Sequence, residues 1–121
     1  MSAESDDRLA QQLRALRREY LVDSTQRVDE LRRLHARLAA GERAALPELR
    51  QAFHRLAGSG GSYGFPSVST RSREGERLAS RLAGADTAVA PEDLEALRAS
   101  VDGVAHAFAE ALSALSAESL G

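Results

Sequence analysis

The stretch AFHRLAGSGGSYGFP, residues 52–66, carries four glycines within seven positions. The apolar residues around its start recur at alternating spacings of four and three, which is typical of one buried face of a helix: Leu49, Phe53 and Leu56. At 100° per residue, Gly60 and Gly64 continue that face. A missing side chain there would let another helix approach closely. The stretch therefore predicts a helix packed against a neighbour.

Gly58 and Gly61 lie on a different face of the expected helix, which they share with His54. Helical side chains lean toward the N-terminus, so a side chain at position 58 would overhang His54. Each helical glycine costs about 1 kcal/mol relative to alanine, and four cost about 4 kcal/mol. A cost of that size indicates a function, namely clearance for a second macromolecule to reach His54.

Two nucleotide-binding motifs and a flexible linker are the other interpretations of these glycines. A Walker phosphate-binding loop requires a lysine, and the chain contains none. A dinucleotide-binding fingerprint requires a third glycine where Tyr63 stands. The composition of GSGGS is compatible with a flexible Gly/Ser linker, but the helical periodicity argues against it.

Composition narrows the class of protein. Apolar residues form 43% of the 121 residues, aromatic residues only 4%, and β-branched residues are scarce, so we expect a single all-α domain over residues 1–121. All sixteen basic residues are arginines, opposed by eighteen acidic ones, which gives no global attraction for nucleic acid or an anionic membrane. With no cysteine and no apolar run long enough for a signal peptide or membrane span, we expect a cytoplasmic protein.

The apolar pattern predicts helices over residues 9–41, from residue 46 through the glycine stretch, over 66–84, and from residue 91, with fraying after Leu115. The first of these is one long helix or two nearly collinear ones, since its phase slips near Asp23, which could cap a new helix together with Gln26.

The last predicted helix carries a heptad-like seam that faces other helices: Leu94, Leu97, Val101, Val104, Phe108, Ala111 and Leu115. The connections between the predicted helices are short, which favours antiparallel neighbours. We therefore predict an up-and-down antiparallel four-helix bundle with a possible extra N-terminal helical segment.

The segment HRLAGSGGSYGF resembles the signature of histidine-containing phosphotransfer (HPt) domains, including those of chemotaxis histidine kinases. The matching positions are His54, Leu56, Gly58, Ser59, Gly60, Gly64 and Val68. Glu76 falls where the family often has a glutamate on the next helix. Two positions depart from the pattern, since Ala57 replaces the family's usual lysine and Gly75 replaces an apolar residue.

The resemblance implies that Nε2 of His54 accepts a phosphoryl group and exchanges it with an aspartate of a response-regulator receiver domain. The partners would be a receiver, a histidine kinase, or both, and they would supply Mg²⁺. We expect a monomeric phosphocarrier with no metal or cofactor of its own and no kinase activity. His35 and His106 have no comparable surroundings.

The resemblance also implies supporting roles for residues around His54. Gly58 and Gly61 would give clearance, and Ser59 would donate a hydrogen bond to the phosphoryl group. Arg50, one turn before His54, and the adjacent Arg55 could replace the missing lysine, because guanidinium groups suit phosphate oxygens.

Other hypotheses stay open at this point. With alanine at position 57, the chain could be a degenerate HPt-like module that docks on a kinase or receiver without phosphotransfer. A generic helical dimerisation domain would share the seam of the last helix between chains. Four arginines at near-helical spacing form either a solvated face partly paired with the acidic last helix or a docking surface for an acidic receiver: Arg71, Arg73, Arg77 and Arg81.

Overall fold

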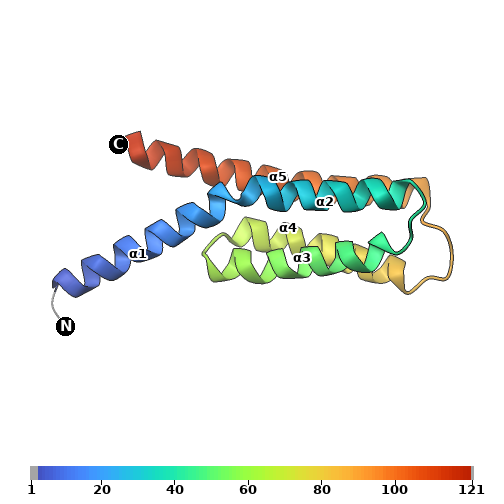
Figure 1. Cartoon of the computed structure of the whole chain (residues 1–121), viewed down its shortest axis with the longest axis horizontal. Helices are drawn as coiled ribbons and strands as arrows, with labels where there is room; N and C mark the ends of the chain where they lie inside the picture. The colour runs from blue at the N-terminus through green and yellow to red at the C-terminus, as the bar shows by residue number, and fades with distance from the viewer. Residues whose placement is uncertain (1–2, 121) are drawn as a thin grey trace.

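The computed structural model describes residues 3–120, with side chains as far as Glu118. These residues form five helices and no strand: α1 (Ala3–Val22), α2 (Ser24–Ala39), α3 (Ala45–Ser62), α4 (Pro66–Ala83) and α5 (Pro91–Leu120). Figure 1 shows α2, α3, α4 and α5 side by side, each running opposite to the helix before it, while α1 extends away from them. The predicted all-α bundle with an extra N-terminal helix is confirmed.

The boundary between α1 and α2 lies at Asp23, where the predicted phase slip occurs. The two helices are not collinear, because α1 leaves the bundle at an angle (Figure 1). The predicted cap is wrong, since Asp23 makes no side-chain capping hydrogen bond. Its backbone keeps near-helical angles, φ −78° and ψ −4°. Backbone hydrogen bonds from Asp23 to Glu19 and from Arg27 to Asp23 continue the ladder and leave little for a cap to satisfy.

The heptad-like seam of α5 forms one side of the bundle core, as predicted. Its central residues are buried: Leu97, Val101, Val104 and Phe108. Leu94, Ala111 and Leu115 pack against this core while partly exposed. Because helices of the same chain fill the seam, it does not provide the shared interface of the dimerisation hypothesis. The helix also continues to Leu120 beyond the predicted fraying point at Leu115.

Prolines begin α4 and α5, and a glycine follows the end of α3. Pro66 and Pro91 open α4 and α5, where a missing N–H has no cost. Gly64 follows the end of α3 with φ +83°, a left-handed conformation that glycine adopts without strain. The expectation that Gly64 continues the buried face of α3 is therefore wrong, because the helix has already ended at Ser62.

Helices α3 and α4 approach closely at two glycines. A Cβ added at Gly60 would lie 2.9 Å from Cγ1 of Val68 and 3.0 Å from the backbone nitrogen of Ser69. A Cβ added at Gly75 would lie 2.5 Å from ring carbons of Phe53. The prediction that Gly60 admits a neighbouring helix is confirmed, and the linker interpretation is wrong, since three of the four glycines are helical.

Candidate functional site

The candidate site centres on His54 of α3, whose side chain is 69% exposed. Its Nδ1 lies 2.8 Å from Oε1 of Glu76 on α4. The ring of Phe53 packs on the backbone of Gly75 where α3 and α4 come close together. His54 directly follows Phe53 in the sequence, and Glu76 directly follows Gly75. The glycine that replaces the family's apolar residue at position 75 thus makes room for the Phe53 ring. Without a side chain at Gly75, the helices come close enough for the Glu76 carboxylate to reach the imidazole.

The Glu76 carboxylate determines which ring nitrogen of neutral His54 carries the proton. An ionised carboxylate only accepts hydrogen bonds, so Nδ1 must donate its N–H to Oε1. The lone pair of the neutral ring then lies on Nε2. No described residue forms a hydrogen bond with Nε2. The arrangement therefore presents an exposed imidazole with its nucleophilic nitrogen toward solvent.

The surface of α3 beside His54 is open. A Cβ at Gly58, one turn further along, would meet no atom within 4 Å. A Cβ at Gly61 would make only ordinary contact with Ser69, 3.6 Å from its Oγ. Packing within the chain therefore explains neither glycine, although each lowers helix stability by about 1 kcal/mol relative to alanine. Their positions match the expected clearance around His54.

The two arginines considered as substitutes for the missing lysine differ in their surroundings. Arg55 pairs with Glu30 of α2 across 3.4 Å, which directs it toward the α2 side of α3. Arg50 is half-buried and forms no hydrogen bond or ion pair with another side chain of the described residues. Since Arg50 lies one turn from His54 on the same helix, it is the better-placed cation.

Ser59 does not lie with His54. Its hydroxyl forms a 2.7 Å hydrogen bond with the hydroxyl of Tyr20 on α1. Five residues along a helix correspond to a rotation of about 140°, which places Ser59 on another side of α3. Burial raises the pKa of the Tyr20 hydroxyl, which therefore stays protonated and can donate. The structure thus uses Ser59 to attach α1 to the bundle, in contrast to the expected contact with a phosphoryl group.

Position 57, where the family usually has lysine, faces α4. Ala57 is 5% exposed, and its carbonyl oxygen accepts a 2.8 Å hydrogen bond from the hydroxyl of Ser69. The position therefore contributes a helix–helix contact and no charge. Any cation near His54 has to come from elsewhere on the chain or from a partner.

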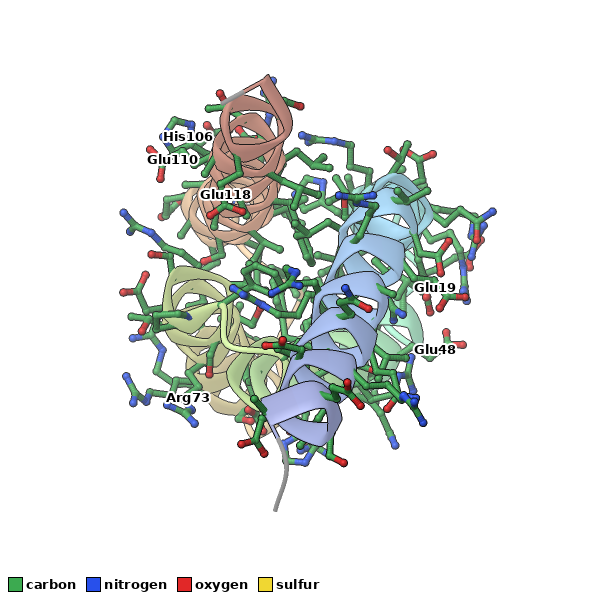
Figure 2. The ribbon with its side chains drawn as sticks, turned by 90° about the vertical axis from the view of Figure 1, so that its left-hand side faces the viewer. Glu19, Glu48, Arg73, His106, Glu110 and Glu118 are labelled. Atoms are coloured by element: carbon green, nitrogen blue, oxygen red, sulfur yellow. The ribbon has the colours of Figure 1, made fainter. Side chains whose placement is uncertain are left out.

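The remaining histidines make different contacts. Nε2 of His35 lies 2.8 Å from the carbonyl oxygen of Leu94, so His35 joins α2 to α5. His106 pairs with Glu110 one turn along α5, on the outer side of the helix (Figure 2). Within the part of the chain that the structure describes, no three histidine, aspartate or glutamate side chains form a group that could hold a metal ion.

The arginine stripe of α4 is only partly paired. Arg71 lies 3.6 Å from Glu74, and Arg81 lies 4.0 Å from Asp93 on the acidic α5. Figure 2 shows Arg73 pointing away from the bundle. These exposed contacts agree with a solvated face partly paired with α5, and pairs of this kind contribute about 0–1 kcal/mol each to stability.

A helical bundle that presents an exposed, carboxylate-oriented histidine beside a glycine-cleared surface defines a class of phosphotransfer modules. The Hpt domain family model matches residues 3–118, nearly the whole chain. The chain therefore belongs to the Hpt domain family and has a histidine phosphotransfer role in two-component signalling. Domains of this family are phosphocarriers that interact with receiver domains and kinases. Among curated proteins and among solved structures, no match was found.

None of the helices within residues 3–120 combines the length and the apolar character needed to cross a bilayer.

Proposed function

We propose that His54 is the phosphoacceptor of this chain and that it exchanges a phosphoryl group with the aspartate of a receiver domain. One observation carries the proposal: an exposed imidazole is held by Glu76 through Nδ1, beside a glycine that packing does not require. This combination leaves Nε2 accessible to a second protein. A purely structural histidine would need neither the free nitrogen nor the clearance.

The Nε2 lone pair forms a bond to phosphorus in line with the P–O bond of an aspartyl phosphate, and that bond breaks to release the receiver's carboxylate. The imidazole keeps its proton on Nδ1 and gains positive charge. The Glu76 carboxylate, 2.8 Å from Nδ1, stabilises that charge through a charge-assisted hydrogen bond. The reverse reaction returns the phosphoryl group to an aspartate by the same steps.

The partner would supply the rest of the chemistry. Phosphoryl transfer depends chiefly on positioning and on neutralising charge at the transferred oxygens. We assign the Mg²⁺ to the receiver or kinase and no cofactor to this chain. Arg50 is available to attract the phosphoryl oxygens, because it lies one turn before His54 on α3 and forms no ion pair with another described residue.

The direct test is phosphotransfer from phosphorylated receivers and active kinases to the wild type and to His54→Gln. We expect an acid-labile, base-stable label that is absent from His54→Gln, whose thermal midpoint stays near the wild-type value because the side chain is exposed. His106→Gln is a matched control, since His106 is 72% exposed and has a glutamate partner at the same 2.8 Å distance. Equal labelling of wild type and His54→Gln would refute the assignment.

A second candidate function is docking without phosphotransfer, and the uncharged, buried position 57 favours it. In this case the chain would regulate a receiver or kinase by binding alone. Binding measured by calorimetry, with no label on His54 from the same bound partner, would identify this function.

A further inference from the structure

Helix α1 carries an apolar stripe that the bundle does not cover. Leu9, Leu13 and Leu16 are 55%, 53% and 48% exposed, although they recur at spacings of four and three that continue to Tyr20. The buried residues of α1 are Tyr20 and Leu21. The earlier turns extend beyond the bundle (Figure 1). Most helical stability in proteins comes from packing an amphipathic face against other elements, so an uncovered stripe of this kind indicates a partner.

The surface around α1 is hollowed in two places. One groove, of about 590 Å³, runs between α1 and the turn that joins α3 to α4, and its lining includes Leu13, Leu16 and Tyr63. Another, of about 350 Å³, lies between α1 and the end of α5, with Leu115 and Glu118 among its lining residues. The divergence of α1 and α5 is visible in Figure 1. Leu13 and Leu16 therefore form part of the wall of a groove into which side chains of another helix can pack.

The charges of α1 indicate which kind of helix packs against it. Its four acidic residues balance its four arginines, so α1 has no net attraction for an anionic membrane or nucleic acid. The signs are segregated along the helix. The first half carries three acidic residues, Glu4, Asp6 and Asp7, against Arg8, and the second half carries three arginines, Arg14, Arg17 and Arg18, against Glu19, so the halves have net charges of opposite sign.

We infer that α1 pairs antiparallel with α1 of a second copy of this chain. Antiparallel pairing places the acidic beginning of each helix beside the basic second half of the other, whereas parallel pairing would juxtapose like charges. A two-fold axis near Gln12 and Leu13 brings Leu9 opposite Leu16 of the second copy, which makes the contact self-complementary. This interface goes beyond the phosphotransfer role and replaces the expectation of a monomer. Two short helices bury little area, so the dimer is weak and concentration-dependent.

Sedimentation equilibrium over about 1 µM to 1 mM tests the dimer, because this range covers the weak affinities expected of a small interface. The wild type should pass from monomer to dimer. Leu13→Gln should raise the dissociation constant about tenfold or more, while Ala15→Gln, on the exposed side of α1, should leave it unchanged. A wild type that stays monomeric throughout overturns the inference. So does a Leu13→Gln variant that dimerises normally but binds a receiver more weakly, because the stripe would then serve that partner.

Charge reversal tests the reason for choosing a second copy. Two doubly substituted chains are compared, Asp6→Arg/Asp7→Arg and Arg14→Glu/Arg18→Glu. Both leave Arg17 unchanged, so it can keep its hydrogen bond to the carbonyl oxygen of Tyr63. Each doubly substituted chain should fail to dimerise alone, because both ends of its α1 then carry one sign. An equimolar mixture should form a heterodimer. Absence of the heterodimer would show that charge pairing does not select the partner.

Cross-linking tests the direction, and it is simple because the chain contains no cysteine. Near the proposed axis, Gln12→Cys should form a disulfide with itself. Asp6→Cys should not, since the two positions would lie about 20 Å apart at a rise of 1.5 Å per residue. A mixture of Asp6→Cys and Glu19→Cys should form the mixed disulfide. Self-cross-linking of Asp6→Cys would mean parallel helices and would overturn the proposed arrangement.

Discussion

The two faces of α3 use glycine in opposite ways. On the face toward α4, Gly60 is buried, and an added Cβ would lie 2.9 Å from Val68. On the face of His54, an added Cβ at Gly58 would meet nothing within 4 Å. The first glycine allows two helices to touch, whereas the second keeps a surface open. Glycines in one short segment therefore cannot be assigned a common role, and the contacts around each one decide its function.

The contrast also separates stability from activity. Substitutions on the buried face of the α3–α4 contact should lower the free energy of unfolding, because close-packed atoms have no room to move. Substitutions on the open face should leave stability intact and slow phosphotransfer. Substitutions at Gly75, Glu76, Gly58 and Arg50 should separate the two effects.

Gly75→Ala should be the most damaging substitution on the buried face. Its Cβ would lie 2.5 Å from the Phe53 ring, and overpacking of this kind costs about 2–3 kcal/mol of the free energy of unfolding. Gly58→Ala is the matched control and should stabilise the chain by up to about 1 kcal/mol, because alanine favours the helix. Urea unfolding measures both. If the two variants lost equal stability, the distinction between the faces would fail.

Glu76→Gln should slow phosphotransfer by about tenfold to a hundredfold, since a hydrogen bond to a charged group contributes about 1.5–3 kcal/mol. The amide still accepts from Nδ1, but it cannot neutralise the charge that forms on the phosphorylated ring. Glu74→Gln is the control, because Glu74 pairs with Arg71 and not with His54. Rapid-quench rates with one receiver provide the measurement, and a normal rate for Glu76→Gln would remove Glu76 from the proposed mechanism.

Gly58→Gln should slow phosphotransfer by about tenfold, the order of effect that misplacing a reacting partner produces. The new side chain would lean back over His54 and obstruct the approaching receiver. Its thermal midpoint should stay near that of the wild type, because no neighbouring atom opposes a side chain at this position. Unchanged transfer in a folded Gly58→Gln variant would contradict the clearance function.

Arg50→Ala should give the smallest effect, a reduction of about two- to fivefold in the transfer rate, because solvent screens a charge that is only half-buried. Arg33→Ala, on α2, removes an exposed arginine elsewhere and serves as the control. The difference should shrink as salt is added, since screening weakens the attraction of Arg50 for the phosphoryl group. Equal rates for the two variants at low salt would show that Arg50 does not replace the missing lysine.

Much of the fold could be predicted from local patterns in the sequence. Prolines 66 and 91 open helices where expected, and the seam of α5 lies in the core. The cap at Asp23 and the continuation of α3 to Gly64 were wrong. In both cases backbone angles decided the outcome, with near-helical values at Asp23 and a positive φ at Gly64. A residue type only biases such angles, and the surrounding hydrogen bonds select among them.

The candidate site was predictable only in part. His54 and its clearance by Gly58 follow from helical geometry within a single segment. Helical geometry does not predict that Ser59 lies beside Tyr20 or that Arg55 lies beside Glu30, because each contact depends on how another helix packs against α3. Glu76 was singled out only through the family resemblance. No local signal connects it to His54, which lies 22 positions earlier in the chain.

Periodicity and composition are properties of neighbouring residues, and they were enough to predict the helices, the shared face of His54 and Gly58, and the mixed charges of α1. The packing of the helices in three dimensions was needed to show that Glu76 meets His54, that Ala57 faces α4, and that the leucines of α1 stay uncovered. These relationships depend on how closely and at what angle helices pack. A contact such as Phe53 on Gly75 sets that distance, which neither residue specifies alone.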